Sequence, residues 1–516
     1  MKKLLALLLA LLMVFATFVS CNTSSSTDET SAPETTEEEV TTTAEETTAE
    51  KKPLSKVSVA NILKSLDPNY ASFASASGCR EAVLSNFSKD SVIKAFTDED
   101  FTEYPVSRIE GAKFETVVLT RSYNTVTLYC DSANEEVRVM WESDAKLKSL
   151  APTEETGKGS ITVAQVGTER VSESDNPLIG MCYVIKLSSG NAIVIDGGFN
   201  NEACANNLYN TLEKMEIAKS GSKYVIEAWI ITHGHGDHAG TFKKFSSLYS
   251  TKAKVQNILL SYPPNDKLVV SGGKSFSTEN FSSASLITPH AGLKYHFGNA
   301  TISMFYTPDM LYTADSQLDY FNDTSLVFKI EGGDASVMFM ADAGEVVSTE
   351  LLASYEESAL KSDIFQLSHH GLYTSANSTH RWTNQKKVYT AIDADYVFLP
   401  MQERLEGNSR NGRYTVLITW AAVKHQISFV MNTSDKHGLS EISQSYYNSF
   451  VDSVKNGTAT KPTLYGYDGI NKIDNGNGLI TYLGGNETDP MITIFELASN
   501  KVTLKTNKPL HEWIGK

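Results

Sequence analysis

The chain has 516 residues, of which 41% are hydrophobic and 10% aromatic, and a formal net charge of −16. These proportions are those of a globular protein, and the length predicts two or three domains with tails. The negative charge excludes a broad phosphate-binding surface, so we expect no stable nucleic-acid partner. Any phosphate group must be held by local cations or by metal.

The first segment has the organisation of an export signal. Met1-Lys2-Lys3 is basic, and the apolar run from Leu4 to Phe18 is short for a membrane-spanning helix. The run is followed by Val19-Ser20-Cys21, and Phe18-Val19-Ser20-Cys21 resembles the lipobox that bacterial lipoprotein signal peptidase cuts. The resemblance implies a signal peptide over 1–21, a lipid on Cys21, and an anchor on the outer face of the cell membrane. The alternative is ordinary secretion with an incidental cysteine.

Residues 22–57 are predicted to form a disordered tether. The stretch 22–52 is rich in Glu and Thr and has almost no large apolar residues. Such a segment cannot bury enough surface to fold, so it would link the lipid to the folded body. No later segment is long and apolar enough to predict a membrane span.

The remaining cysteines are Cys79, Cys130, Cys182 and Cys204, and none forms a CxxC motif. Thiolate binding of metal is therefore not expected. Outside the cytoplasm Cys79 could pair with Cys130, and Cys182 with Cys204. Buried free thiols are the equal alternative.

Residues 58–151 predict a small α+β domain. Val59–Leu66 and Ser91–Phe96 are typical of short helices, and Ala112–Ser143 alternates apolar and polar residues as strands do. We find no catalytic group in this domain. A linker rich in Pro, Gly and Glu closes it over 151–159.

Residues 160–431 predict a layered α/β domain, because strand-like runs are separated by a helix-like one. The predicted elements are strands at Ile161–Val166, Cys182–Leu187, Asn191–Gly198 and Tyr224–Thr232 and a helix at Asn206–Ser220. Residues 432–516 form a C-terminal extension with strand-like runs between Leu464 and Thr506. This extension is either a β-rich cap or a set of extra strands on the core.

Five of the eleven histidines lie in two short clusters. The first is His233-Gly234-His235-Gly236-Asp237-His238, at the end of the apolar run Tyr224–Thr232. Side chains two residues apart in an extended chain point to the same side, so His233 and His235 can coordinate one ion. Asp237 and His238 would then point toward a second ion. Imidazole and carboxylate ligands suit Zn²⁺, with Mn²⁺ or Fe as alternatives.

The stretch THGHGDHAG is similar to the signature of the metallo-β-lactamase superfamily, and the resemblance continues in order over 160–431. It implies an αββα sandwich that holds two divalent metal ions. By this resemblance Asp196 supports the metal loop from behind the ligands, and Asp342 bridges both metals. Taken alone, an Asp at either strand end would be a turn or cap residue.

The second cluster, His369-His370-Gly371, resembles the HHG motif of a branch that includes DNA-uptake competence proteins and choline-phosphate esterases of the cell wall. The resemblance implies that one histidine completes the second metal site and the other faces the substrate. We favour His369 as the ligand, because it comes first after the strand, with His370 as the close alternative. His370 or Tyr373 would then assist departure of the leaving group.

One departure from the family concerns the first metal site. Many members have a further histidine ligand before the bridging Asp, but the matching stretch here, Tyr320–Phe328, has none. Asn322 or Asp323 stands about where it would be, and the competence-protein branch has a similar Asn-containing segment. We therefore expect Asn322 to lie behind the ligands. His290 and His296 lie upstream and are expected to be surface or packing residues.

Together these features predict a lipid-anchored, extracytoplasmic hydrolase with two divalent ions. Its expected substrate is a small-molecule or polymer phosphoester, such as wall-associated phosphocholine or nucleic acid, cleaved by a metal-bridging hydroxide. The expected catalytic residues are Asp237, Asp342 and His370. The alternatives are an acyl hydrolase of the lactone or lactam type and a non-catalytic lipoprotein that binds a ligand.

Overall fold

The computed structural model describes most of the region from Cys79 onward. The described residues are 79–85, 87–122, 124–131, 133, 135–142, 159–169, 180–263, 277–311, 318, 321–371, 381–400, 428–431, 463–465, 472–474, 480–482, 490–499 and 501–515. All described residues belong to the unit 54–516 of the chain. The predicted signal peptide with Cys21, the tether, the helix Val59–Leu66 and Tyr373 lie outside the described residues. No described helix has the length and apolar character needed to cross a membrane.

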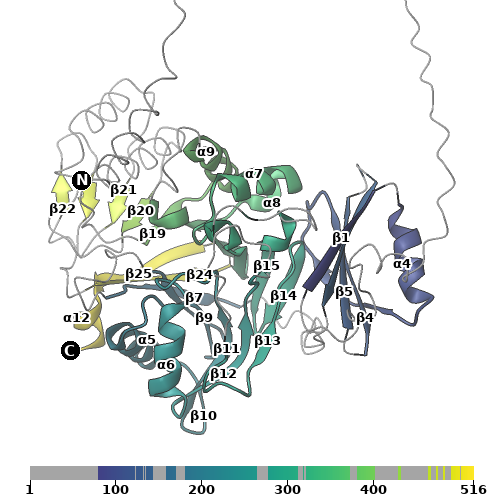
Figure 1. Ribbon diagram of the computed structural model, residues 1–516. Helices are drawn as coiled ribbons and strands as arrows, with labels where there is room; N and C mark the ends of the chain where they lie inside the picture. Colours follow the sequence, from purple (N-terminus) through teal and green to yellow (C-terminus); the bar gives the residue numbers. More distant parts are fainter. Residues whose placement is uncertain are drawn as a thin grey trace, which may run out of the picture. The chain divides into compact units, whose positions relative to one another are not determined.

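The predicted small α+β segment contains a five-stranded antiparallel sheet in the order β1-β6-β5-β4-β2. Its strands are β1 (Cys79–Ser85), β2 (Thr102–Tyr104), β4 (Glu115–Arg121), β5 (Asn124–Asp131) and β6 (Glu136–Glu142). Helix α4 (Lys89–Thr97) lies against this sheet (Figure 1). It begins after Ser88, whose side chain accepts from the Ser91 N–H, and it buries Val92 and Phe96. The predicted helix and the predicted strand pattern of this segment are both confirmed.

A nine-stranded sheet carries the first half of the core. Its strands are β7 (Ile161–Val166), β8 (Cys182–Lys186), β9 (Ala192–Asp196), β10 (Lys219–Ser220), β11 (Lys223–Ile230), β12 (Ala253–Leu259), β13 (Ser285–Ile287), β24 (Met491–Ala498) and β25 (Lys501–Pro509). One face is covered by α5 (Glu202–Lys214) and α6 (Gly240–Tyr249), visible in Figure 1, and α12 (Leu510–Ile514) packs in the same layer. The α5 helix starts earlier than predicted, because Asn201 caps it by accepting from the Cys204 N–H, and its predicted last residues instead form β10.

An eleven-stranded sheet carries the second half. Its strands are β3 (Ser107–Arg108), β14 (Leu293–Phe297), β15 (Ala300–Tyr306), β16 (Val327–Gly332), β17 (Ala335–Phe339), β18 (Ile364–Gln366), β19 (Tyr396–Leu399), β20 (Ser428–Met431), β21 (Thr463–Tyr465), β22 (Lys472–Asp474) and β23 (Ile480–Tyr482). The helices over its outer face are α7 (Glu345–Ser354), α8 (Glu357–Leu360) and α9 (Arg381–Ile392). Short 3₁₀ turns connect these elements at η3 (Pro308–Met310), η4 (Phe321–Thr324) and η5 (Ser368–Gly371).

Three apolar cores define the layers. One core joins inward side chains of the two large sheets, such as Tyr183 and Phe339, whose rings meet edge to face at 5.0 Å. A second core packs α5 and α6 onto the nine-stranded sheet around Trp229. A third core packs α7 and α9 onto the eleven-stranded sheet. Helices therefore cover both outer faces of two stacked sheets, which confirms the predicted αββα sandwich.

The C-terminal extension supplies strands to both large sheets. The β24 strand pairs antiparallel with β7, and β21 pairs parallel with β20. Of the two alternatives for this extension, the described strands fit extra strands on the core. The small N-terminal segment also reaches the core, because β3 pairs with β14.

Three of the cysteines are buried free thiols, namely Cys130, Cys182 and Cys204. The structure therefore contains neither of the two disulfides that the sequence left open. Burial raises the pKa of Cys130 to about 12 and that of Cys204 to about 11. These thiols behave as small apolar side chains of the core.

Candidate metal centre

The histidine loop is fixed to the sheet by Asp196, which ends β9. Its Oδ1 accepts from the Thr232 backbone N–H at 2.9 Å, and its Oδ2 accepts from the Thr232 hydroxyl at 2.8 Å. The same Oδ2 lies 2.8 Å from Nδ1 of His238. Because β9 and β11 are parallel neighbours, Asp196 and Thr232 leave the sheet at the same edge. Asp196 therefore stands behind the loop, where the sequence analysis placed it.

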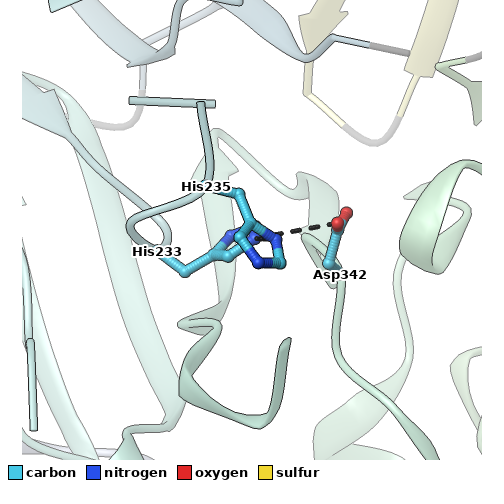
Figure 2. Close-up of side chains that lie close together, drawn as sticks. All are labelled: His233, His235 and Asp342. Carbon is cyan, nitrogen blue, oxygen red and sulfur yellow. Dashed lines mark hydrogen bonds and ion pairs between the residues drawn. The ribbon is translucent and has the colours of Figure 1, made fainter. Parts of the chain in front are cut away.

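A first group of potential ligands consists of His233, His235 and Asp342. Figure 2 shows the two rings together, facing the carboxylate of Asp342. Nε2 of His233 lies 3.0 Å from Nδ1 of His235 and 3.7 Å from Oδ2 of Asp342. On its other side, the His235 ring stacks on Phe321, with centroids 4.6 Å apart.

A second group consists of Asp237, His238 and His370. Nε2 of His370 lies 3.5 Å from Oδ2 of Asp237, and Nε2 of His238 lies 4.0 Å from the same oxygen. Asp342 also faces this group, because its Oδ1 lies 3.2 Å from Nε2 of His238 and 3.4 Å from Nε2 of His370. One oxygen of Asp342 thus faces each group, which is the arrangement of a bridging carboxylate.

The donor atoms of this centre test whether metal ions fit it. His238 Nε2, His370 Nε2 and Asp342 Oδ1 are buried and make no hydrogen bond within the described part of the chain. Buried polar atoms are nearly always hydrogen-bonded, so three unsatisfied atoms that converge need a partner. The opposite ring nitrogens are held by Asp196 and by the carbonyl of Pro400, which His370 Nδ1 approaches at 2.8 Å. Imidazoles held in this way present Nε2 to a metal, so the second group fits a divalent ion. The first group offers donors of the same kind, two imidazoles and a carboxylate, that lie close enough to hold another ion.

The charges of the centre explain its pKa values. Burial alone would lower the pKa of His238, but the carboxylates of Asp342 and Asp196 raise it well above its usual value. Burial alone would raise the pKa of Asp342, but the neighbouring histidines hold it well below its usual value. His233 has a lowered pKa, because burial and the nearby His238 outweigh the attraction of Asp342. The Asp342 carboxylate is therefore ionised and ready to neutralise cations.

The HHG turn places its two histidines differently from the expectation. His369 and His370 both have left-handed backbone angles, with φ of 47° and 54°. His370 joins the second ligand group, whereas Nε2 of His369 lies 3.8 Å from Oδ2 of Asp342 and the His369 side chain is 14% exposed. The geometry thus favours His370 over His369 as the ligand, which reverses the order that we favoured from the sequence. The physical reason is the left-handed turn, since it redirects the side chains after β18.

The side chain of Gln366 fixes this turn against the loop that carries Asp342. Its Oε1 accepts from the backbone N–H groups of Met340 and Ala341 at 2.9 and 2.6 Å. The His369 N–H donates to the Ala341 carbonyl at 2.8 Å. The loops after the parallel strands β17 and β18 are therefore held together, which sets the distance between Asp342 and His370.

The segment without the family's extra histidine lies beside the centre. Asn322 is fully buried in η4, and Ser325 just after it accepts from the Asp342 N–H at 3.2 Å. The Leu326 N–H donates to the Thr232 carbonyl at 2.9 Å. Asn322 belongs to neither ligand group, and its place behind the ligands stays a prediction.

His290 and His296 lie away from both ligand groups. His290 is buried with its Nδ1 3.7 Å from Oδ2 of Asp309, and His296 contacts Thr301 on the neighbouring strand. The packing role expected for them agrees with these contacts.

Three contributors escaped the sequence analysis: Thr232, the Pro400 carbonyl and Phe321. The hydroxyl of Thr232 stands directly before the histidine loop, a position that could have suggested its bond to Asp196. Pro400 reaches the centre from a distant part of the chain. Phe321 lies in the stretch Tyr320–Phe328, but its side chain offers no ligand atom that would mark it.

Residues 175–295 match the family described as the Metallo-beta-lactamase superfamily. The match includes Asp196 and the His233–His238 loop and ends before Asp342 and His370. The chain therefore contains a metallo-β-lactamase superfamily domain, and the fold adds the remaining residues of the centre. A search of curated proteins found no match.

Two solved structures are similar over part of the chain. A mutant of CmlA beta-hydroxylase aligns with 48% of this chain and 46% of its own length, with 14% identity and a TM-score of 0.29. The Zn²⁺-bound PqqB from Methylobacterium extorquens aligns with 40% of this chain and 72% of its own, with 10% identity and a TM-score of 0.27. The chain thus spans about half the length of the first.

Proposed function

We propose that the protein is a dinuclear metal-dependent hydrolase that cleaves phosphodiester bonds. The observation that carries the proposal is the position of Asp342, with one oxygen toward each ligand group. Two divalent ions held there would lower the pKa of water from about 15.7 toward neutrality and would clamp the attacking and leaving oxygens of a phosphoryl displacement. Zn²⁺ suits the His and Asp donors best, with Mn²⁺ or Fe as alternatives.

The residues of the chain have distinct parts in this proposal. Asp342, Asp237 and the four grouped histidines hold the ions, and Asp196, Thr232 and the Pro400 carbonyl orient the rings. His369 is left to face the substrate, because it is partly exposed and belongs to neither group. Its imidazole is placed to donate a hydrogen bond to a phosphate oxygen. From the sequence we expected His370 to face the substrate and His369 to bind the metal, so the two residues exchange roles in this proposal.

Phosphodiester specificity is supported by sequence rather than by geometry. The His369-His370-Gly371 motif resembles that of competence proteins and choline-phosphate esterases, and Asn322 or Asp323 stands where many relatives have a histidine ligand. Both features are analogies of fold and motif. The proposed substrate is a phosphoester outside the cytoplasm, either wall-associated phosphocholine or a nucleic acid, bound only during turnover. Lipidation of Cys21 would hold the enzyme at the outer face of the membrane.

A substrate panel tests this proposal. The full chain is loaded with Zn²⁺ or Mn²⁺ and assayed on bis-p-nitrophenyl phosphate, DNA and the lactam nitrocefin. We expect hydrolysis of a phosphodiester and not of nitrocefin. Asp342→Asn should abolish the activity, whereas Asp395→Asn, at an exposed position, serves as the matched control.

The outcomes separate the candidate functions. Turnover of nitrocefin alone would replace the proposal with the acyl hydrolase. Absence of turnover of every substrate with both ions bound would favour the non-catalytic ligand-binding lipoprotein.

A further inference from the structure

A cluster of lysines lies at the end of the nine-stranded sheet that is farthest from the histidine loop. Strands β11 and β12 run parallel, so their first residues share one edge, with β10 beside them at the foot of the sheet in Figure 1. The last turn of α5 reaches the same edge, because Glu213 accepts from the Tyr224 hydroxyl at 3.3 Å. Since β11 has 8 residues, about 26 Å of strand separates this lysine edge from the histidine loop.

The charge of the lysine edge is opposite to that of the whole protein. The segments 213–223 and 250–254 contain more lysines than carboxylates, in a chain whose formal net charge is −16. Within the described part of the chain, none of these lysines takes part in an ion pair. The local field is therefore positive and attracts negatively charged partners. The lysines are Lys214, Lys219, Lys223, Lys252 and Lys254, and the carboxylates are those of Glu213 and Glu216.

Stacked tyrosines hold two of the lysines in place. The rings of Tyr209 and Tyr249 lie parallel with centroids 4.2 Å apart, and Tyr224 meets Tyr209 edge to face at 5.5 Å. Nζ of Lys219 lies 4.3 Å from the centre of the Tyr224 ring, and Nζ of Lys252 lies 5.5 Å from that of Tyr209. A ring face attracts an ammonium group without neutralising its charge. Both lysines are exposed, so their charges stay accessible to a partner.

Leu248 adds an apolar side chain to the same edge. It lies in the last turn of α6, just before Lys252, and is 39% exposed. In the described part of the chain, only Leu248 and Val346 are large apolar side chains with this degree of exposure. A soluble phosphate polymer would bind the lysines and gain nothing from the leucine. A lipid surface accepts both, since charges meet its headgroups and apolar side chains enter the boundary with the acyl chains.

We propose that the lysine edge docks on a membrane surface that contains anionic lipid. Lys219, Lys223 and Lys252 contact the headgroups, and Leu248 enters the boundary below them. The metal centre then faces away from the lipid, because it lies at the opposite end of the sheet. The inference is independent of the reaction at the metal centre. The proposed lipid on Cys21 would favour the docking by keeping the chain close to the membrane.

Amide hydrogen exchange of the full chain tests the docking. The chain is mixed with vesicles of phosphatidylcholine alone, or with vesicles of phosphatidylcholine and phosphatidylglycerol in equal parts. Insertion of an N-terminal anchor is possible in both, so only the charge of the surface differs. Exchange over 213–223 and 248–254 should slow only on the vesicles that contain phosphatidylglycerol. About 1 M NaCl should abolish the slowing, because the Debye length is then about 3 Å.

Variants connect the slowing to the lysine edge. Lys219→Gln combined with Lys252→Gln should lower the ratio of docked to undocked chain about 25-fold, at about fivefold for each lysine, and so remove the slowing. Leu248→Gln should reduce the slowing as well. Lys387→Gln is the matched control, at an exposed position on α9 over the other large sheet, and should change nothing. Far-UV circular dichroism checks that each variant is folded.

The wild-type chain alone can refute the proposal. No slowing on vesicles with phosphatidylglycerol, or equal slowing on phosphatidylcholine alone, would overturn it whatever the variants do. Soluble polyphosphate, added without vesicles, provides the last comparison. If it slows exchange over the same segments as much as the vesicles do, and Leu248→Gln has no effect, the lysine edge binds an anionic polymer and the proposal is wrong.

Discussion

The two ligand groups of the centre differ in how firmly the rest of the chain holds them. In the second group, His238 is tied to Asp196 and His370 to the Pro400 carbonyl, both at 2.8 Å. In the first group, Nδ1 of His233 lies 3.2 Å from the Thr232 hydroxyl, and His235 is half-buried with its ring stacked on Phe321. The family's further histidine is also missing beside this group. We therefore expect the second group to bind a metal ion more tightly than the first.

Asp342 is the element that the two groups share, so its loss should have the largest effect. Asp342→Asn removes the charge that faces both groups while it keeps the shape of the side chain. We expect the chain to bind fewer than two ions and hydrolysis to fall by about 10³-fold or more. Elemental analysis of the dialysed protein and initial rates check this. Two ions bound with full activity would show that Asp342 bridges nothing.

Asp196 should affect the second group more than the first. Asp196→Asn weakens the hold on His238 and Thr232, and loss of such a partner typically costs about 10–100-fold in metal affinity. Competition with a chromophoric chelator measures each binding step separately. Equal weakening of both steps would mean that Asp196 supports the whole loop and does not favour one ion.

A substitution of Phe321 should affect the first group more than the second. Phe321→Ala removes the ring on which His235 stacks and opens space beside Gly234. We expect the affinity of the first group for its metal ion to fall by about tenfold or less. A ring pair of this kind contributes about 0.5–1.5 kcal/mol. The step assigned to the second group should stay unchanged in the same chelator competition. A larger effect on the second step would reverse our ranking of the groups.

The smallest effect on metal binding is expected for Asp309. It is a buried carboxylate beside a histidine, but it lies outside the metal centre. Burial opposes its ionisation, but contacts with His290 and the Tyr129 hydroxyl lower its pKa overall. A lowered folded-state pKa stabilises the fold above the unfolded value of about 3.9, and this contribution is lost as the pH falls. Asp309→Asn should therefore cost about 1–3 kcal/mol of stability at pH 7 and leave metal binding unchanged.

Denaturant unfolding across the pH range checks this last prediction. The stability difference between the wild type and Asp309→Asn should shrink below about pH 4. A difference that stays constant at all pH values would show that the charge of Asp309 does not matter.

The same contrast explains how far the sequence could predict the site. Apolar strands lead directly into Asp196, the His233–His238 loop and Asp342. This local pattern predicts both the strand and the polar group at its end. The placement of His370 depends on two consecutive left-handed residues and on the Gln366 contacts with a neighbouring loop. Spacing along the chain does not encode such a turn, so the order of His369 and His370 could not be predicted.

The fold, like the site, could be predicted only in part from the sequence. Four strands of the first large sheet could be predicted from their apolar runs, and the helix α5 was misplaced only at its ends. The pairing of β24 with β7 joins residues more than 300 positions apart, and no local signal specifies it. Phe321 reached the site in the same non-local way. Long-range packing, rather than local propensity, therefore determined what the sequence could not reveal.

We propose that this chain holds two divalent ions in two unequal groups. Titration of the metal-free full chain with Zn²⁺ against a competing chelator tests it most directly. We expect two ions per chain to bind in two resolved steps. Asp196→Asn should lower the affinity of the tighter step, and Phe321→Ala that of the weaker step. Saturation at one ion per chain, or two steps that both variants weaken equally, would contradict it.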